Sequence, residues 1–266
     1  MLRRLRSFFS MIKFSHSIFA LPFALQAAWL AAGGRPAWAT LGYIVLALVA
    51  ARTAAMAFNR YVDRDLDARN PRTAVRELPS GVLAPSFVLA VVVFSSAVFV
   101  AAAYQLNSLA GVLSVPVLVV LLGYSFMKRL HFGSHLVLGL ALALAPLAAW
   151  IAVRGEWHGL LGPVGLLAAA VWTWVAGFDV IYACQDAEFD RSAGLHSIPA
   201  RFGVARALWI SRGLHAITIA CLAGFAWSSG LAWIYAGAVA VAACLLIWEQ
   251  SLVRAEDLSR VNLAFF

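Results

Sequence analysis

Charged residues are scarce in this chain: they make up 12% of its 266 residues, whereas 63% are hydrophobic. A water-soluble domain carries roughly twice that charged fraction. Apolar runs of about twenty residues, the length that spans a bilayer as a helix, recur along the sequence. These runs are continuous rather than alternating, which excludes a closed outer-membrane barrel. The composition therefore predicts a membrane protein built of helices and excludes a large water-soluble core.

Cysteine is also rare. Cys184, Cys221 and Cys244 lie in apolar stretches without metal-ligand spacing, so we interpret them as core residues rather than as disulfide or metal positions. The six histidines show no ligand spacing either, and they are interpreted as interfacial or packing residues. A long linker is lacking as well, so residues 1–266 are expected to form a single transmembrane domain.

Hydropathy predicts eight full spans. They cover about 14–32, 37–58, 86–105, 109–126, 135–153, 160–182, 204–227 and 231–248. A cleaved signal peptide is the alternative for the basic, apolar start, but that run is long enough to span and further spans follow it. After a polar stretch, the last four residues read as the first turn of a ninth span that stops, so this span is expected to be truncated.

The basic residues are distributed unevenly between the two membrane faces. With the N-terminus inside, the inner connections carry sixteen of the 20 Lys and Arg, the outer ones carry Arg35 and Arg154, and Arg52 and Arg212 fall within spans. The positive-inside rule therefore predicts a cytoplasmic N-terminus in a cell inner membrane. It also accounts for the net charge of +8 without a nucleic-acid partner. Among the acidic residues, Glu156 alone is expected outside.

Two segments at the inner ends of spans hold most of the acidic residues. In the first, Asn59, Asp63 and Asp67 are spaced 4+4; in the second, Tyr182, Asp186 and Asp190 repeat that spacing. On an α-helix, positions i and i+4 lie on one face about 6 Å apart. Each segment therefore predicts a row of oxygen ligands along one helix face.

Stacked carboxylates near hydrocarbon need a cation to offset their repulsion and desolvation. Hard, oxygen-seeking Mg²⁺ typically binds one or two carboxylates plus phosphate oxygens and water. Two such rows therefore predict a pair of metal ions that hold a diphosphate, with Asp63, Asp67, Asp186 and Asp190 as the metal ligands. One DxxxD at a helix end is also common as a solvated interfacial feature, but two with the same spacing and on the same face are harder to explain in that way.

Basic residues complete the pattern on the predicted inner face. Arg76 follows the first motif, and the fourth predicted span ends with Tyr124, Lys128 and Arg129. Such groups can bind diphosphate oxygens or an acceptor carboxylate, and arginine can do so with two parallel bonds. The alternative is a role in topology and in binding lipid headgroups.

The paired motifs NxxxDxxxD and DxxYxxxDxxxD, together with the LPSG turn and the YSFMKR stretch, resemble the UbiA superfamily of membrane prenyltransferases. The likeness runs from about Lys13 to the end of the chain. QDAEFDRSAGLHSIPARFG and IKFSHSIFALPFA are most similar to the UbiA-like branch, whose members are commonly labelled 4-hydroxybenzoate polyprenyltransferases. Some members are thought to prenylate 1,4-dihydroxy-6-naphthoate in a menaquinone route. The resemblance implies nine spans around a central cavity that opens to the cytoplasm.

The resemblance also implies a reaction and a set of roles. The four aspartates would hold Mg²⁺ on an allylic polyprenyl diphosphate, with Asn59 as a neutral partner. Lys128, Arg129 and Arg76 would stabilise the leaving diphosphate, and an electron-rich aromatic acid would attack the allylic cation. Asp179 and Tyr182 would orient that acceptor or take its ring proton. The substrate-binding residues would be Asn59, Arg76, Lys13 and Tyr124.

Two other classes of membrane protein are alternatives to this interpretation. A transporter would place its acidic residues at mid-bilayer on interrupted helices, whereas these lie at one face. A CDP-alcohol phosphotransferase would begin its motif with Asp-Gly, a dipeptide that this chain lacks. The partners expected are therefore the two substrates and membrane lipids, with no obligate protein partner.

Overall fold

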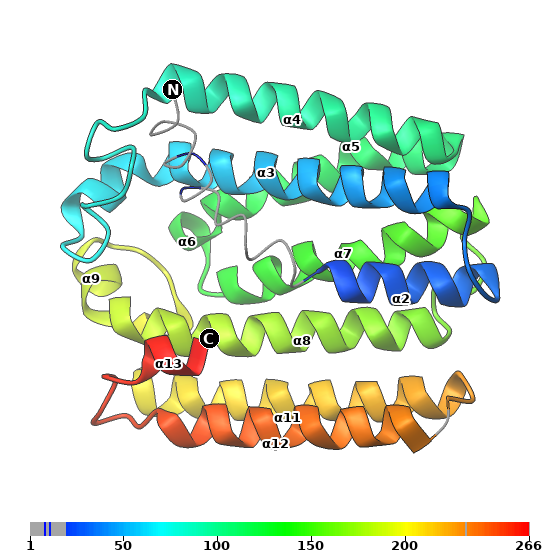
Figure 1. Ribbon diagram of the computed structural model, residues 1–266. Coiled ribbons are helices and arrows are strands. Elements are labelled where there is room, and N and C mark those ends of the chain that lie inside the picture. The colour runs from blue at the N-terminus through cyan, green and yellow to red at the C-terminus, as the bar shows by residue number, and fades with distance from the viewer. Residues whose placement is uncertain (1–7, 9–10, 12–19, 232, 266) are drawn as a thin grey trace. The chain divides into compact units, whose positions relative to one another are not determined.

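The computed structural model describes Phe8, Met11 and residues 20–231 and 233–265, and these are mostly helical (Figure 1). Across these ranges no strand occurs, although Arg254 and Asp257 form an isolated bridge. Seven of the described helices are long and apolar enough to cross a membrane. The expected all-helical, multi-pass architecture is confirmed. The chain divides into two compact units, which are taken in turn.

The first unit comprises Met1–Phe126 and Ala148–Trp157. Its elements are α2 (Leu21–Ala32), α3 (Trp38–Arg69), α4 (Pro85–Leu106), α5 (Ser108–Gly123) and the 3₁₀ turn η2 (Tyr124–Phe126). Helix α3 packs along α4, and α4 packs against α5 (Figure 1). Small side chains on α3, namely Ala47, Ala50 and Ala51, meet Phe99 and Ala102 of α4. Such residues allow helix backbones to approach closely within a membrane.

Asn107 fixes the start of α5. Its side-chain oxygen accepts a hydrogen bond from the Ala110 N–H at 2.8 Å, which caps the helix. Its amide nitrogen donates to the carbonyl oxygens of Ile151 and Ala152, at 2.9 and 3.2 Å. Asn107 thereby joins the α4–α5 turn to a segment more than forty residues away.

The second unit comprises Met127–Leu147 and His158–Phe266. Its elements are α6 (Met127–Leu130), α7 (Ser134–Arg154, shared with the first unit), α8 (Pro163–Ala183), the 3₁₀ turn η3 (Cys184–Asp186), α9 (Ala187–Ser192), α10 (Ile198–Phe202), α11 (Val204–Ser228), α12 (Trp233–Leu252) and α13 (Val261–Phe265). Helices α8 and α11 form its most extensive contact (Figure 1).

Polar side chains connect α8, α11 and α12. Ser211 on α11 donates to the Gly177 carbonyl of α8 at 2.8 Å, and the Gln250 amide of α12 donates to Ser211 at 2.9 Å. Gly177 is required here because a side chain at this position would collide with the His215 ring. The second unit is therefore held by close backbone approach and interhelical hydrogen bonds, as membrane helices often are.

Most of the expected spans correspond to described helices. The first overlaps residues outside the described ranges, and its described part is the 12-residue α2. The eighth covers Tyr235–Leu252 rather than 231–248. Of the four residues predicted to start a ninth span, 263–265 belong to α13 and Phe266 lies outside the described residues. Val261 of α13 is buried in a core cluster with Val180, Ile198 and Leu208. The single-domain expectation stays a prediction.

Candidate active site

The first acidic motif lies near the end of α3, which is continuous from Trp38 to Arg69. Asn59, Asp63 and Asp67 therefore lie one turn apart on one helix face, as predicted. The Asn59 amide donates to Asp63 Oδ2 at 2.9 Å. That amide turns its oxygen away from Asp63, so Asn59 supports the carboxylate as a hydrogen-bond donor.

Asp67 is held by the loop that follows α3. Its two carboxylate oxygens accept from Arg76 Nη1 at 2.7 and 2.9 Å. Thr73, which is buried, donates its hydroxyl to the Asp67 carbonyl oxygen at 3.1 Å. Leu78 and Leu83 anchor the same loop in a core cluster of the first unit. The loop therefore holds a guanidinium against the last carboxylate of the motif.

Two further arginines lie on α3, Arg52 before the motif and Arg60 within it. Arg52 and Arg60 each bury their Nε without a hydrogen-bond partner among the described residues, and both interact electrostatically with Tyr124 of η2. Arg52 shares the face of Asn59 and Asp63, because intervals of 7 and 11 residues are close to whole turns. Sequence reasoning placed Arg52 within a span but gave it no role. An arginine inside a span was the available signal.

The second motif departs from the expected geometry. α8 ends at Ala183, the chain passes through the 3₁₀ turn η3, and α9 begins at Ala187. The prediction that Tyr182, Asp186 and Asp190 form a straight row on one α-helix is therefore wrong. A 3₁₀ turn has three residues per turn instead of 3.6, so it rotates the residues that follow it around the helix axis.

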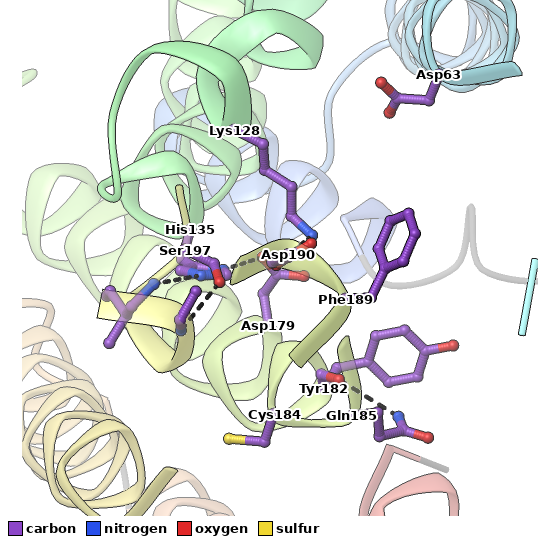
Figure 2. A network of polar contacts seen from close by, with 12 residues as sticks. Asp63, Lys128, His135, Asp179, Tyr182, Cys184, Gln185, Phe189, Asp190 and Ser197 are labelled. Atoms are coloured by element: carbon purple, nitrogen blue, oxygen red, sulfur yellow. Dashed lines mark hydrogen bonds and ion pairs between the residues drawn. The ribbon is translucent and has the colours of Figure 1, made fainter. Parts of the chain in front are cut away.

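Asp190 is paired with a basic residue distant in sequence. Lys128 Nζ lies 3.4 Å from Asp190 Oδ2, whose side chain is 2% exposed (Figure 2). The His196 N–H donates to the Lys128 carbonyl oxygen at 2.6 Å, which joins the α9–α10 loop to α6. The second motif thus repeats an arrangement of the first: a buried aspartate that contacts a predicted diphosphate-binding base.

Asp179 lies two helical turns before Asp186 and contacts a histidine. His135 Nδ1 is 2.6 Å from Asp179 Oδ2, and His135 is fully buried (Figure 2). Sequence reasoning missed this residue, since it searched for ligand spacing among the histidines and this pair spans 44 positions.

The remaining predicted site residues have varied surroundings. Asp186 is buried in η3. Tyr182 is partly buried and packs against the core cluster of the second unit, and its catalytic role stays a prediction. Arg129 is half-buried on α6. Lys13 lies outside the described residues.

The four predicted metal ligands are divided between the two units. Among the described residues, no three His, Cys, Asp or Glu side chains come together in a group that could hold a metal ion. Asp63 and Asp67 belong to the first unit, whereas Asp186 and Asp190 belong to the second. The four-carboxylate set therefore stays a prediction.

Comparison with known proteins decides the family. The model of the UbiA prenyltransferase family matches residues 20–266. The chain belongs to this family. It is therefore a transferase of prenyl groups. It is 34% identical over 232 residues to a 4-hydroxybenzoate octaprenyltransferase of Tolumonas auensis, covering 86% of this chain and 79% of that protein.

Solved structures of the family share the fold. A UbiA homologue from Aeropyrum pernix K1, solved in an apo form, is 38% identical, with a TM-score of 0.87 over 95% of this chain and 92% of that one. A UbiA homologue from Archaeoglobus fulgidus bound to DMAPP and Mg²⁺ is 18% identical, with a TM-score of 0.71 over 97% of this chain and 94% of that one. The second likeness concerns the fold alone.

Proposed function

We propose that this prenyltransferase moves a polyprenyl chain from an allylic polyprenyl diphosphate to a 4-hydroxybenzoate-type aromatic acid, with Mg²⁺ as cofactor, in quinone biosynthesis. The observation that carries the proposal is the repeated pairing of a buried motif aspartate with a base, Asp67 with Arg76 and Asp190 with Lys128. The name of the relative from Tolumonas auensis supports the choice of acceptor.

The donor chemistry of the two motifs fits Mg²⁺. Asp63, Asp67, Asp186 and Asp190 offer carboxylate oxygens without a sulfur or imidazole ligand, and Mg²⁺ prefers such oxygens together with phosphate and water. When bound, the metal would neutralise the diphosphate and stabilise it as a leaving group. The Mg²⁺-bound homologue from Archaeoglobus fulgidus is consistent with this cofactor.

The bases beside the motifs would bind the departing diphosphate. Arg76 and Lys128 each contact a motif carboxylate, so any diphosphate held at those carboxylates lies within their reach. Arg129 follows Lys128 on α6 and would add positive charge. Such fixed charges act where negative charge develops as the allylic C–O bond breaks.

Arg52 and Asp179 would bind the acceptor. Arg52 is our candidate for the acceptor carboxylate, because its buried Nε has no hydrogen-bond partner in the described part of the chain. A guanidinium suits a carboxylate through two parallel hydrogen bonds. Asp179 would orient the phenol and take the ring proton as the new C–C bond forms, with the electron pair of the broken C–H bond returning to the ring.

A membrane location fits this reaction, because both the polyprenyl donor and the prenylated product are lipids. We propose a multi-pass protein of the cell inner membrane with a cytoplasmic N-terminus, supported by the excess of Lys and Arg on that face. The cavity for the prenyl chain would open on the same side, where the two motifs are predicted to lie.

The test is a transfer assay with full-length protein in lipid nanodiscs, one labelled polyprenyl diphosphate and a panel of acceptors. We expect Mg²⁺-dependent prenylation of 4-hydroxybenzoate that stops on chelation and resumes when Mg²⁺ is restored. Turnover unaffected by chelation would refute the metal role. Strong preference for 1,4-dihydroxy-6-naphthoate would move the enzyme to the menaquinone route.

A further inference from the structure

His135 lies in the first turn of α7, and both of its ring nitrogens are engaged. Nδ1 lies 2.6 Å from Asp179 Oδ2 on α8, and Nε2 accepts a hydrogen bond from the Ile198 N–H at 3.3 Å (Figure 2). The ring is fully buried. It therefore joins α8 to the start of α10 through two directed contacts.

These contacts fix the tautomer of the imidazole. A backbone N–H always donates, so Nε2 must hold a lone pair and cannot carry a proton. The single ring proton is then on Nδ1, where it is donated to Asp179 Oδ2. The Ile198 N–H is itself held in place, because its neighbour Ser197 is buried and accepts from the Ala200 N–H at 3.3 Å.

We propose that His135 is a positioning residue for prenyl transfer: it holds Asp179 Oδ2 so that Oδ1 faces the aromatic acceptor. This inference rests on the role proposed above for Asp179, whose side chain is 25% exposed. It also assigns the proton. Because Nε2 already accepts the Ile198 N–H, His135 does not relay the proton that the aromatic acceptor loses. That proton passes to Asp179 Oδ1 and from there to solvent.

Two amide replacements distinguish the two ring nitrogens. His135→Asn places an N–H donor near the position of Nδ1 and should keep the contact with Asp179. His135→Gln places its amide near the position of Nε2 and should lose that contact, as should His135→Leu. A displaced catalytic group typically costs on the order of 100-fold in rate. We therefore expect kcat to fall about 10- to 100-fold in the Gln and Leu variants, and to stay within about threefold of wild type in the Asn variant.

The donor KM should stay unchanged in all three variants, because His135 acts on the acceptor side. A purely structural role predicts instead that activity follows thermal stability in all three, with no specific rescue by Asn. That result would overturn the proposal. Absence of transfer by the wild-type protein would contradict the proposed function rather than the positioning role, which the next measurement tests without turnover.

Nitrogen NMR of ¹⁵N-histidine-labelled, full-length protein in nanodiscs reports the tautomer directly. The His135 signal is assigned by its loss in His135→Asn, or by eliminating the other histidines one at a time if that variant does not fold. We expect a neutral ring with the proton on Nδ1. A ring protonated on Nε2, or on both nitrogens, overturns the proposal.

Discussion

Arg52 is the residue whose replacement most clearly separates acceptor binding from folding. Arg52→Met keeps a long apolar side chain and removes the charge. If the guanidinium binds the acceptor carboxylate, its loss removes charge-assisted hydrogen bonds worth about 1.5–3 kcal/mol. Because 1.4 kcal/mol corresponds to a factor of ten, kcat/KM for 4-hydroxybenzoate should fall about 10- to 150-fold.

The stability of the Arg52→Met variant should not fall with its activity. A charged side chain inside a span costs about 2.5–3.5 kcal/mol on insertion scales, so methionine at position 52 should leave the thermal midpoint equal or higher. Arg212→Met is the matched control: Arg212 also lies within a span, but its guanidinium stacks 4.7 Å from the Trp209 ring, which is exposed. This control should leave acceptor kinetics unchanged.

The assay compares 4-hydroxybenzoate with its methyl ester at fixed donor concentration. Wild-type protein should reject the ester, because Arg52, whose Nε is buried, would lose its charged partner. Arg52→Met should treat acid and ester nearly alike. If the variant keeps the wild-type ratio of kcat/KM for acid over ester, Arg52 does not bind the carboxylate.

Three further sets of variants test other parts of the account. Asp67→Ala and Asp190→Ala should nearly abolish turnover while the protein stays folded. The control Asp65→Ala, which like Asp67 lies on α3 but has a 79% exposed side chain, should stay active. Normal turnover of Asp67→Ala and Asp190→Ala at saturating Mg²⁺ would contradict their roles. Asn107→Ala should destabilise the protein by about 1–2 kcal/mol through loss of a helix cap and two backbone contacts, measured as the thermal midpoint in detergent; an unchanged midpoint would count against the cap. Gly177→Ala should lower the free energy of unfolding by about 1–3 kcal/mol, because the added methyl group collides with the His215 ring. Gly213→Ala should leave stability nearly unchanged, because a methyl group there has no atom within 4 Å.

The local part of the site could be predicted from the sequence. Hydropathy and i,i+4 spacing suffice for α3, since Asn59, Asp63 and Asp67 lie on one unbroken helix. The same reasoning failed at η3, because Cys184, Gln185 and Asp186 carry no proline or glycine to mark a change of helix type. The family resemblance, read from both motifs, is confirmed.

The long-range part could not be predicted in this way. Lys128 and Asp190 are 62 positions apart, and His135 and Asp179 are 44 apart. Spacing along one helix says nothing about such pairs, which depend on how α6, α7, α8 and α9 pack. The sequence around His135 gives no sign of its role. That role depends on the Ile198 N–H and the Asp179 carboxylate, which tertiary packing brings to the imidazole ring.

The most direct test of the central claim is an experimental structure of the protein with Mg²⁺ and an unreactive allylic thiodiphosphate. The account predicts that Asp63, Asp67, Asp186 and Asp190 surround the metal ions, with the diphosphate between them and the bases Arg76 and Lys128. Paired catalytic metals lie about 3.5–4 Å apart, so Asp63 and Asp186 carboxylates more than about 15 Å apart in that complex would contradict a shared two-metal site.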